Sequence, residues 1–241
     1  MKDYLLGLDL SIYRALNDFC GWNAVLDRLA VHGSSIGGAL FMGIIGALWF
    51  SPDKEATHRR QTIIIMLLAV ALSLILNRAL STMMPFRYRP MYSVGAHAPS
   101  FEWHADQENW SSFPSDNATY LFAIAAGFWL ISRWAGLLFA AFATYIAASR
   151  VFLGIHFPSD VLVGAIIGIA TSIAVNREVV RQVVAGRLLA LEPRYRARFY
   201  CLLFIALAEV SGGFPTTRHI GVAIVHLFVP YDATRAHGNP S

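Results

Sequence analysis

The chain has 241 residues, of which 56% are hydrophobic and 14% are charged, with a formal net charge of +4. Soluble domains carry roughly 25% charged residues, so the composition excludes an ordinary soluble domain and predicts an integral membrane protein. In a soluble protein the basic balance would suggest nucleic-acid binding. Here we expect the bilayer as the partner and no nucleic acid. We predict one domain over 1–241, and the sequence leaves its oligomeric state open.

The first predicted element, 4–20, is amphipathic and is expected either to lie in the membrane interface or to form a marginal span. Asp3 and Asp9 stand near its start, and no long apolar core follows a basic beginning, so a cleaved signal peptide is not expected. Apolar segments near the roughly 20 residues of a spanning helix then follow. They occupy 34–50, 62–80, 118–132, 134–149, 160–176 and 199–214, with a weaker stretch at 217–229. The predicted fold is all-α, a polytopic membrane bundle of about six transmembrane helices.

Positive charges gather in the loops 51–61, 132–134 and 176–198, which fall on one side of this bundle. The positive-inside rule places these loops in the cytoplasm. The other ends of the helices, which carry the motifs below, then face the periplasm or exterior from a cell inner membrane. These three loops hold ten of the 19 Lys and Arg residues: Lys54, Arg59, Arg60, Arg133, Arg177, Arg181, Arg187, Arg194, Arg196 and Arg198.

A long loop, 81–113, joins two of the predicted spans on the outer side. Loops of this length without obvious structure are usually functional or disordered. The loop is rich in aromatic residues, which argues against disorder and suits a membrane-interface belt or a groove for an apolar substrate. These residues are Tyr88, Tyr92, Phe101, Trp103, Trp110 and Phe113.

Three arginines, Arg87, Arg89 and Arg150, fall at helix ends on the outer side. An arginine at the end of a membrane helix is costly without a partner, so their convergence implies an anion. Guanidinium groups match the oxygens of phosphate. Arg87 could instead contact lipid headgroups.

The tetrapeptide FPSD occurs twice, at 113–116 and 157–160. Proline is favoured at the first position of a helix, and the backbone N–H groups behind it have no partner within the helix. Such a start can bind a phosphate. We therefore expect two helix starts facing one phosphoryl group, with helix capping as the alternative role of Ser115 and Asp116.

His156 immediately precedes the second FPSD, and Asp160 follows it by four residues. A carboxylate at this place can accept a hydrogen bond from one ring nitrogen and fix the tautomer. The other nitrogen is then available as a nucleophile or base. No cluster of His, Asp or Glu with metal-ligand spacing is expected on this side, and Cys20 and Cys201 form no metal motif. We expect no metal and no cofactor.

Residues 62–176 resemble the type-2 phosphatidic acid phosphatase superfamily, the lipid phosphate phosphatases. That family reads K-x6-RP, then PSGH, then SR-x5-H-x3-D. The first motif retains Arg89 and the proline after it, although Thr82 occupies the lysine position. The third motif is complete, long and specific, and consists of Ser149, Arg150, His156 and Asp160.

The second motif retains Pro114 and Ser115, with Asp116 in place of glycine and Asn117 in place of histidine. Its SFPSD form is similar to the undecaprenyl-diphosphatase branch, in which the motif usually ends in histidine. The resemblance implies a six-helix membrane enzyme that hydrolyses lipid phosphates without a metal, and we expect a polyprenyl diphosphate as the substrate. His156 would form a phosphohistidine. The implied catalytic residues are His156, Asp160 and Asn117, and the implied substrate-binding residues are Arg87, Arg89, Ser115, Asp116 and Arg150.

Asn117 leaves three interpretations open, because in the family the histidine at its place protonates the leaving group. The substrate could be a diphosphate, whose leaving group is a phosphate ester with a second pKa of about 6 that departs with little help. Another group could donate the proton, with His97 and His104 as candidates. The protein could also be catalytically weak, by nature or through a substitution.

Two other functions remain as alternatives. A phosphotransferase on the same fold would pass the phosphoryl group to a lipid or sugar acceptor. A non-catalytic lipid-phosphate binder or transporter would use the same arginines without releasing phosphate. Few charges fall within predicted spans, chiefly Arg78 and Glu209, which disfavours transport.

Overall fold

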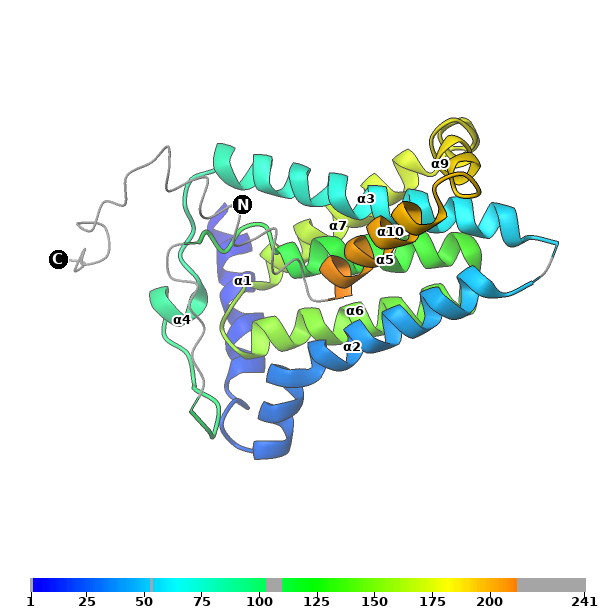
Figure 1. The fold of residues 1–241 in the computed structure, drawn as a ribbon. Coiled ribbons are helices and arrows are strands. Elements are labelled where there is room, and N and C mark those ends of the chain that lie inside the picture. The colour runs from blue at the N-terminus through cyan, green and yellow to red at the C-terminus, as the bar shows by residue number, and fades with distance from the viewer. Residues whose placement is uncertain (1, 53, 103–109, 212–241) are drawn as a thin grey trace, which may run out of the picture.

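The structure is a computed structural model that describes residues 2–52, 54–102 and 110–211. Every regular element within these ranges is helical, which confirms the all-α prediction. The central bundle is built around α5 (Asp116–Ile131), which packs against its neighbours at the centre of the molecule (Figure 1). These neighbours are α3 (Ala56–Met83), α6 (Arg133–Phe152) and α7 (Pro158–Val175).

The other helices surround this bundle. The long α2 (Ala24–Phe50) packs on α3, α6 and α10 (Arg196–Ser211). Helix α1 (Lys2–Asn17) runs across one end of the bundle and contacts α6 and α7 (Figure 1). The short helices are α4 (Pro90–Ser93), α8 (Glu178–Val180), the π-helix η1 (Arg181–Ala185) and α9 (Gly186–Leu191).

Helix α5 is the central element and packs against α3, α6 and α7. Its Phe128 stacks on Phe139 of α6 with ring centroids 4.2 Å apart, and Phe41 of α2 meets both rings edge-on. Stacked and edge-to-face pairs contribute beyond the apolar area they bury. This aromatic cluster therefore fixes α2 and α6 against α5, and α5 in turn places the loop that precedes it.

The packing of α5 against α7 depends on two glycines, Gly164 and Gly168. A Cβ added at Gly164 would meet the carbonyl oxygen of Ser115, and one at Gly168 would meet that of Thr119. Small residues four apart allow the backbones of membrane helices to approach closely. The first turns of α5 and α7 are consequently held side by side.

Three helices are long and apolar enough to cross a membrane: α3, α6 and α7. Helices α3 and α6 contain the predicted segments 62–80 and 134–149, and α7 covers the predicted segment 160–176 up to Val175. Helices α5 and α10 each have 16 residues, and the apolar stretch of α2 is Leu40–Phe50. The described ranges thus contain three helices of spanning length and do not confirm the expected count of about six, and the stretch 217–229 lies outside these ranges.

The ends of the helices separate the basic loops from the motifs. Helix α3 ends where α5 and α7 begin and α6 ends, whereas the α5–α6 connection and η1 lie at the opposite end (Figure 1). At that opposite end Arg59 is buried and donates to the carbonyls of Leu48 and Ser51, at 2.6 and 2.7 Å. Arg59 thus caps the C-terminus of α2, where a cation is favourable. This capping role is additional to its place among the basic residues of the predicted cytoplasmic side.

Replacing Gly168 with alanine is expected to separate α5 from α7, because the new methyl group meets backbone atoms that cannot move aside. Overpacking of this kind costs about 1–3 kcal/mol of unfolding free energy. The measurement is the thermal unfolding midpoint of the purified protein in detergent. Gly43→Ala in α2 is the matched control, since a Cβ there meets nothing within 4 Å. Equal midpoints for the two variants would contradict the close approach.

Candidate active site

The three sequence motifs meet at the bundle end formed by the starts of α5 and α7. The two FPSD copies touch directly, because the backbone N–H of Ser115 donates to the carbonyl of Asp160 at 3.0 Å. Pro158 stands at the first position of α7, as expected. The first copy differs: Pro114 precedes the N-cap Ser115, and α5 begins only at Asp116. The prediction of proline at the first helical position is therefore right for the second copy and wrong for the first.

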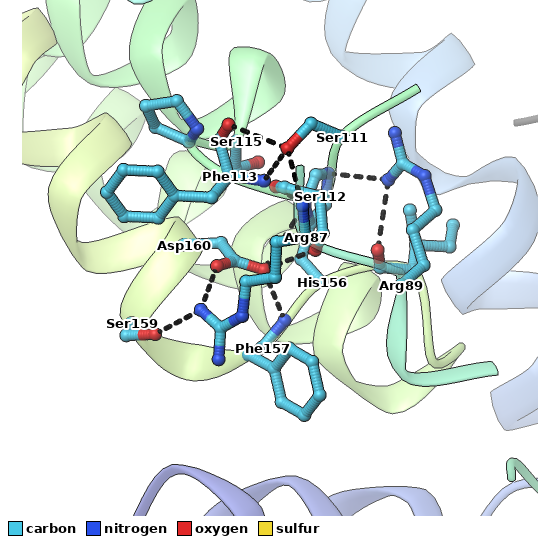
Figure 2. A network of polar contacts seen from close by, with 12 residues as sticks. Arg87, Arg89, Ser111, Ser112, Phe113, Ser115, His156, Phe157, Ser159 and Asp160 are labelled. Carbon is cyan, nitrogen blue, oxygen red and sulfur yellow. Dashed lines mark hydrogen bonds and ion pairs between the residues drawn. The ribbon is translucent and has the colours of Figure 1, made fainter. Parts of the chain in front are cut away.

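His156 lies at the centre of this cluster and is 1% exposed. Its Nδ1 is 2.8 Å from the carbonyl oxygen of Ser112, and its Nε2 is 3.3 Å from Nη1 of Arg89. A carbonyl oxygen only accepts and a guanidinium only donates. Nδ1 therefore carries the hydrogen, and the lone pair of Nε2 faces Arg89 (Figure 2).

Burial lowers the pKa of His156 below its ordinary value, and the positive charge of Arg89 acts in the same direction. The carboxylate of Asp160 opposes both effects, but burial is the largest of the three. Removing an imidazolium from water is unfavourable. The ring is thus held neutral, with one nitrogen able to attack an electrophile.

Asp160 does not bond to the histidine ring as the sequence analysis expected. Its Oδ2 lies 3.9 Å from Nδ1, which is too long for a hydrogen bond. The same oxygen accepts from the hydroxyl of Ser112 and from the backbone N–H of Phe157 at 2.8 Å. Asp160 therefore fixes Ser112, and it is the carbonyl of Ser112 that fixes the tautomer of His156.

The two arginines of the first motif point to different partners (Figure 2). Arg89 is buried, donates to the carbonyl of Ile155 at 2.9 Å and reaches the histidine ring. Arg87 forms ion pairs with Asp160 and, at 2.6 Å, with Asp9, and its guanidinium lies 4.2 Å from the centre of the Phe157 ring. The structure thus places Arg89 beside Nε2 of His156. It directs Arg87, expected to bind substrate, toward carboxylates.

Arg150 forms the last turn of α6, directly before the histidine loop. Its carbonyl accepts from the backbone N–H groups of Ile155 and His156, at 2.9 and 3.3 Å. Gly154 allows the tight turn between them with a φ of +70°, a conformation that other residues rarely adopt. The backbone of Arg150 therefore sets where the ring of His156 emerges.

The second motif occupies the first turn of α5. Ser115 is buried and its hydroxyl caps the helix by accepting from the N–H of Ala118 at 3.5 Å, which is the capping role considered as the alternative. Asp116 accepts from the backbone N–H of Asn117 at 2.9 Å and lies 3.4 Å from its amide nitrogen. The amide oxygen of Asn117 lies 3.5 Å from the Tyr120 hydroxyl. Ser115, Asp116 and Asn117 therefore all lie at the start of α5, where backbone N–H groups can bind an anion.

The other residues named for proton or phosphate chemistry lie apart from the histidine contacts. Thr82, at the family lysine position, is bonded within its own helix to the carbonyl of Ala79 at 2.8 Å. The ring of His97 is 62% exposed and lies 3.7 Å from Asp18. His104 lies outside the described residues. The described residues thus give no contact that links these side chains to His156.

Sequence reasoning missed three polar residues of the cluster: Ser112, Asp9 and Ser159. Asp9 is 7% exposed and accepts from both the backbone N–H and the hydroxyl of Ser159, at 2.8 and 2.7 Å. The sequence showed only a carboxylate within an amphipathic stretch, and its burial, which requires partners, is visible only in the structure. Asn77 of α3 was also missed; it donates to the Thr119 hydroxyl at 2.8 Å and steadies the α5 start.

Known proteins provide an independent comparison. The putative undecaprenyl-diphosphatase YbjG of Escherichia coli (strain K12) is 35% identical over 113 residues, which cover 46% of this chain and 54% of that protein. This chain therefore spans about half the length of that relative. The undecaprenyl-diphosphatase BcrC of Bacillus subtilis (strain 168) is 26% identical over 67% of this chain and 79% of its own length.

The crystal structure of Aquifex aeolicus LpxE resembles the fold with a TM-score of 0.52 and 28% identity. The match covers 69% of this chain and 93% of that one. A model of the PAP2 superfamily matches residues 62–191, which is more than half of the chain and includes all three motifs. The chain therefore belongs to the PAP2 superfamily, as the motifs had predicted.

Proposed function

We propose that the chain is a membrane phosphatase that hydrolyses a lipid diphosphate of the polyprenyl class through a phosphohistidine on His156. The observation that carries this proposal is the neutral, buried imidazole with Nδ1 on the Ser112 carbonyl and Nε2 toward Arg89. A nucleophile needs an unprotonated nitrogen and a fixed direction. Family membership and the undecaprenyl-diphosphatase names of two relatives support the substrate class.

In the first step, Nε2 of His156 attacks the terminal phosphorus and the P–O bond to the lipid monophosphate breaks. The ring then carries a positive charge. Its Nδ1–H stays bonded to the Ser112 carbonyl, and the Asp160 carboxylate at 3.9 Å stabilises the charge. Electrostatic groups in place before charge develops lower a barrier most effectively.

In the second step, a water molecule attacks the phosphorus, the P–N bond breaks and the imidazole recovers its lone pair. The products are inorganic phosphate and a proton released to solvent. Arg89 and Arg150, with the N–H groups at the starts of α5 and α7, would hold the phosphoryl oxygens in both steps. These guanidinium groups would stabilise the negative charge on the phosphoryl oxygens, as a metal ion does in metal-dependent phosphatases. We therefore propose a metal-independent reaction.

The same proposal orients the chain in a cell inner membrane. The basic loops lie at the bundle end opposite the His156 cluster, and the positive-inside rule would place them in the cytoplasm. The site would then face the periplasm or exterior. It would bind the diphosphate headgroup in the outer interface, with the lipid chain remaining in the bilayer.

The function is tested by phosphate release from a panel of polyprenyl and glycerolipid mono- and diphosphates in detergent. His156→Ala is expected to reduce release by on the order of 10⁴-fold or more, because it removes the nucleophile. EDTA is expected to have no effect. His58→Ala, at the far end of α3, is the control and should retain activity. Release that survives His156→Ala, or that EDTA abolishes, would refute the mechanism, and binding without release would favour a lipid-phosphate binder.

Asn117→His tests why this chain dispenses with the family histidine. A histidine at the start of α5 could protonate a leaving group, and general acid catalysis is worth roughly 10²–10⁴-fold. A lipid alkoxide needs that proton far more than a phosphate ester does. We therefore expect monophosphate turnover to rise roughly 10- to 100-fold and diphosphate turnover to persist with little change. Equal gains on both substrates would remove the leaving-group explanation.

A further inference from the structure

Helix α1 has three distinct sides. One side is buried against the bundle and consists of Asp9, Tyr13 and Asn17, which are 7%, 1% and 3% exposed. An adjacent side presents Leu8, Ile12 and Leu16 to the surroundings. The remaining side is polar and exposed, with Ser11, Arg14 and, after the helix, Asp18. Residues four apart share a helix face, so each side is a continuous stripe.

The surroundings of α1 identify what covers its apolar stripe. The helix runs across the end of the bundle where α6 ends and α7 begins, two helices of spanning length (Figure 1). A helix at that level with one apolar and one polar side matches the boundary between acyl chains and headgroups. Phe19 and Trp22, just beyond α1, are 52% and 76% exposed, and such aromatics are enriched at this boundary. The chemistry therefore fits a lipid surface.

The buried stripe of α1 bonds to the loops around the histidine. Tyr13 donates to the carbonyl of Gly95 at 2.7 Å. Asn17 donates to the carbonyl of Phe152 at 2.8 Å and accepts from the N–H of His97 at 2.8 Å. Buried polar groups that are satisfied in this way make a position unique. Helix α1 is thus held by specific hydrogen bonds to two segments near His156, the loop after α4 and the end of α6.

Asp9 extends this docking to the site itself. Its carboxylate contacts Nη2 of Arg87 at 2.6 Å and the N–H and hydroxyl of Ser159. Nη1 of Arg87 pairs with Asp160, whose other oxygen accepts from Ser112. The carbonyl of Ser112 then fixes Nδ1 of His156. A continuous path of ion pairs and hydrogen bonds therefore joins α1 to the attacking ring.

We propose that α1 lies in the lipid headgroup layer with its Leu8–Ile12–Leu16 stripe against the acyl chains, and that Asp9 is a positioning residue for the Arg87–Asp160 pair. This inference rests on the proposed function. Without the charge of Asp9, Arg87 retains one of its two carboxylates and Ser159 loses part of its anchor. The histidine would keep its chemistry but lose its alignment.

The kinetic test compares Asp9→Asn with Asp18→Asn, using a polyprenyl diphosphate in lipid nanodiscs. Small misplacements of reacting groups cost on the order of 10²-fold, so we expect kcat of Asp9→Asn to fall on the order of 10- to 100-fold with KM nearly unchanged. Asp18 is 62% exposed, and its replacement should leave both constants at the wild-type value. Asp9→Glu, which keeps the charge, should recover part of the loss.

A lowered KM with unaltered kcat in Asp9→Asn would show that Asp9 competes with substrate for Arg87, and would overturn the proposal. Unchanged constants would overturn it as well. Ser159→Ala keeps the Asp9–Arg87 pair and should give a smaller loss in the same constant, so the path remains testable if Asp9→Asn does not fold. A wild-type protein that releases no phosphate would instead refute the proposed function.

The lipid contact is tested without any activity. Ile12→Cys and Ser11→Cys, each in a Cys201→Ala background because Cys201 is exposed, carry a fluorescent label in nanodiscs with spin-labelled acyl chains. We expect strong quenching at position 12 and weak quenching at position 11. Equal quenching, or protection at position 12 together with crosslinking between two copies of the chain, would overturn the interfacial placement.

Discussion

The site depends on one hydrogen bond, from Nδ1–H of His156 to the carbonyl of Ser112. This bond decides which nitrogen of the ring keeps its lone pair, and burial keeps the ring neutral so that the lone pair is available. The carbonyl can serve only if the 111–113 segment is immobile. Asp160 ensures this by accepting from the Ser112 hydroxyl. Its own backbone is fixed as well, because its N–H donates to the carbonyl of Phe157 and its carbonyl accepts from the N–H of Ser115. Asp160 therefore fixes the tautomer of His156 through Ser112.

That hydrogen bond in turn requires α5 and α7 to begin side by side. Gly164 and Gly168 let the two backbones approach, the N–H of Ser115 bonds to the carbonyl of Asp160, and Asn77 holds Thr119 from α3. Stacked phenylalanines fix the other half of α5. The helix bundle thus holds the site rigidly, and α1 covers the end of the bundle at which the site lies. A positioned group needs such support to remain within reach of its target.

The sequence was sufficient for the all-α class and for the family, because the third motif is local and specific. The family resemblance also brought Arg89 of the first motif together with His156 of the third. The sequence was insufficient for Asp9 and Ser112. Asp9 meets Arg87 across 78 positions, and no local pattern announces a contact between such distant residues. The expected Asp160–His156 bond failed for a related reason: spacing of four residues predicts a shared face only within a helix, whereas Gly154 turns the chain just before the histidine. The second FPSD copy followed the predicted proline rule and the first did not, since Ser115 rather than Phe113 caps its helix.

The account is tested most directly by locating the phosphoryl group on the enzyme. The protein would be mixed with a polyprenyl diphosphate under single-turnover conditions, quenched in alkali, which preserves phosphohistidine, and mapped by mass spectrometry with authentic standards for the two isomers. The geometry predicts phosphate on His156 and on its Nε2 nitrogen, since Nδ1 is held by the Ser112 carbonyl. Phosphate on Nδ1, on another residue, or on no residue during rapid turnover would contradict it.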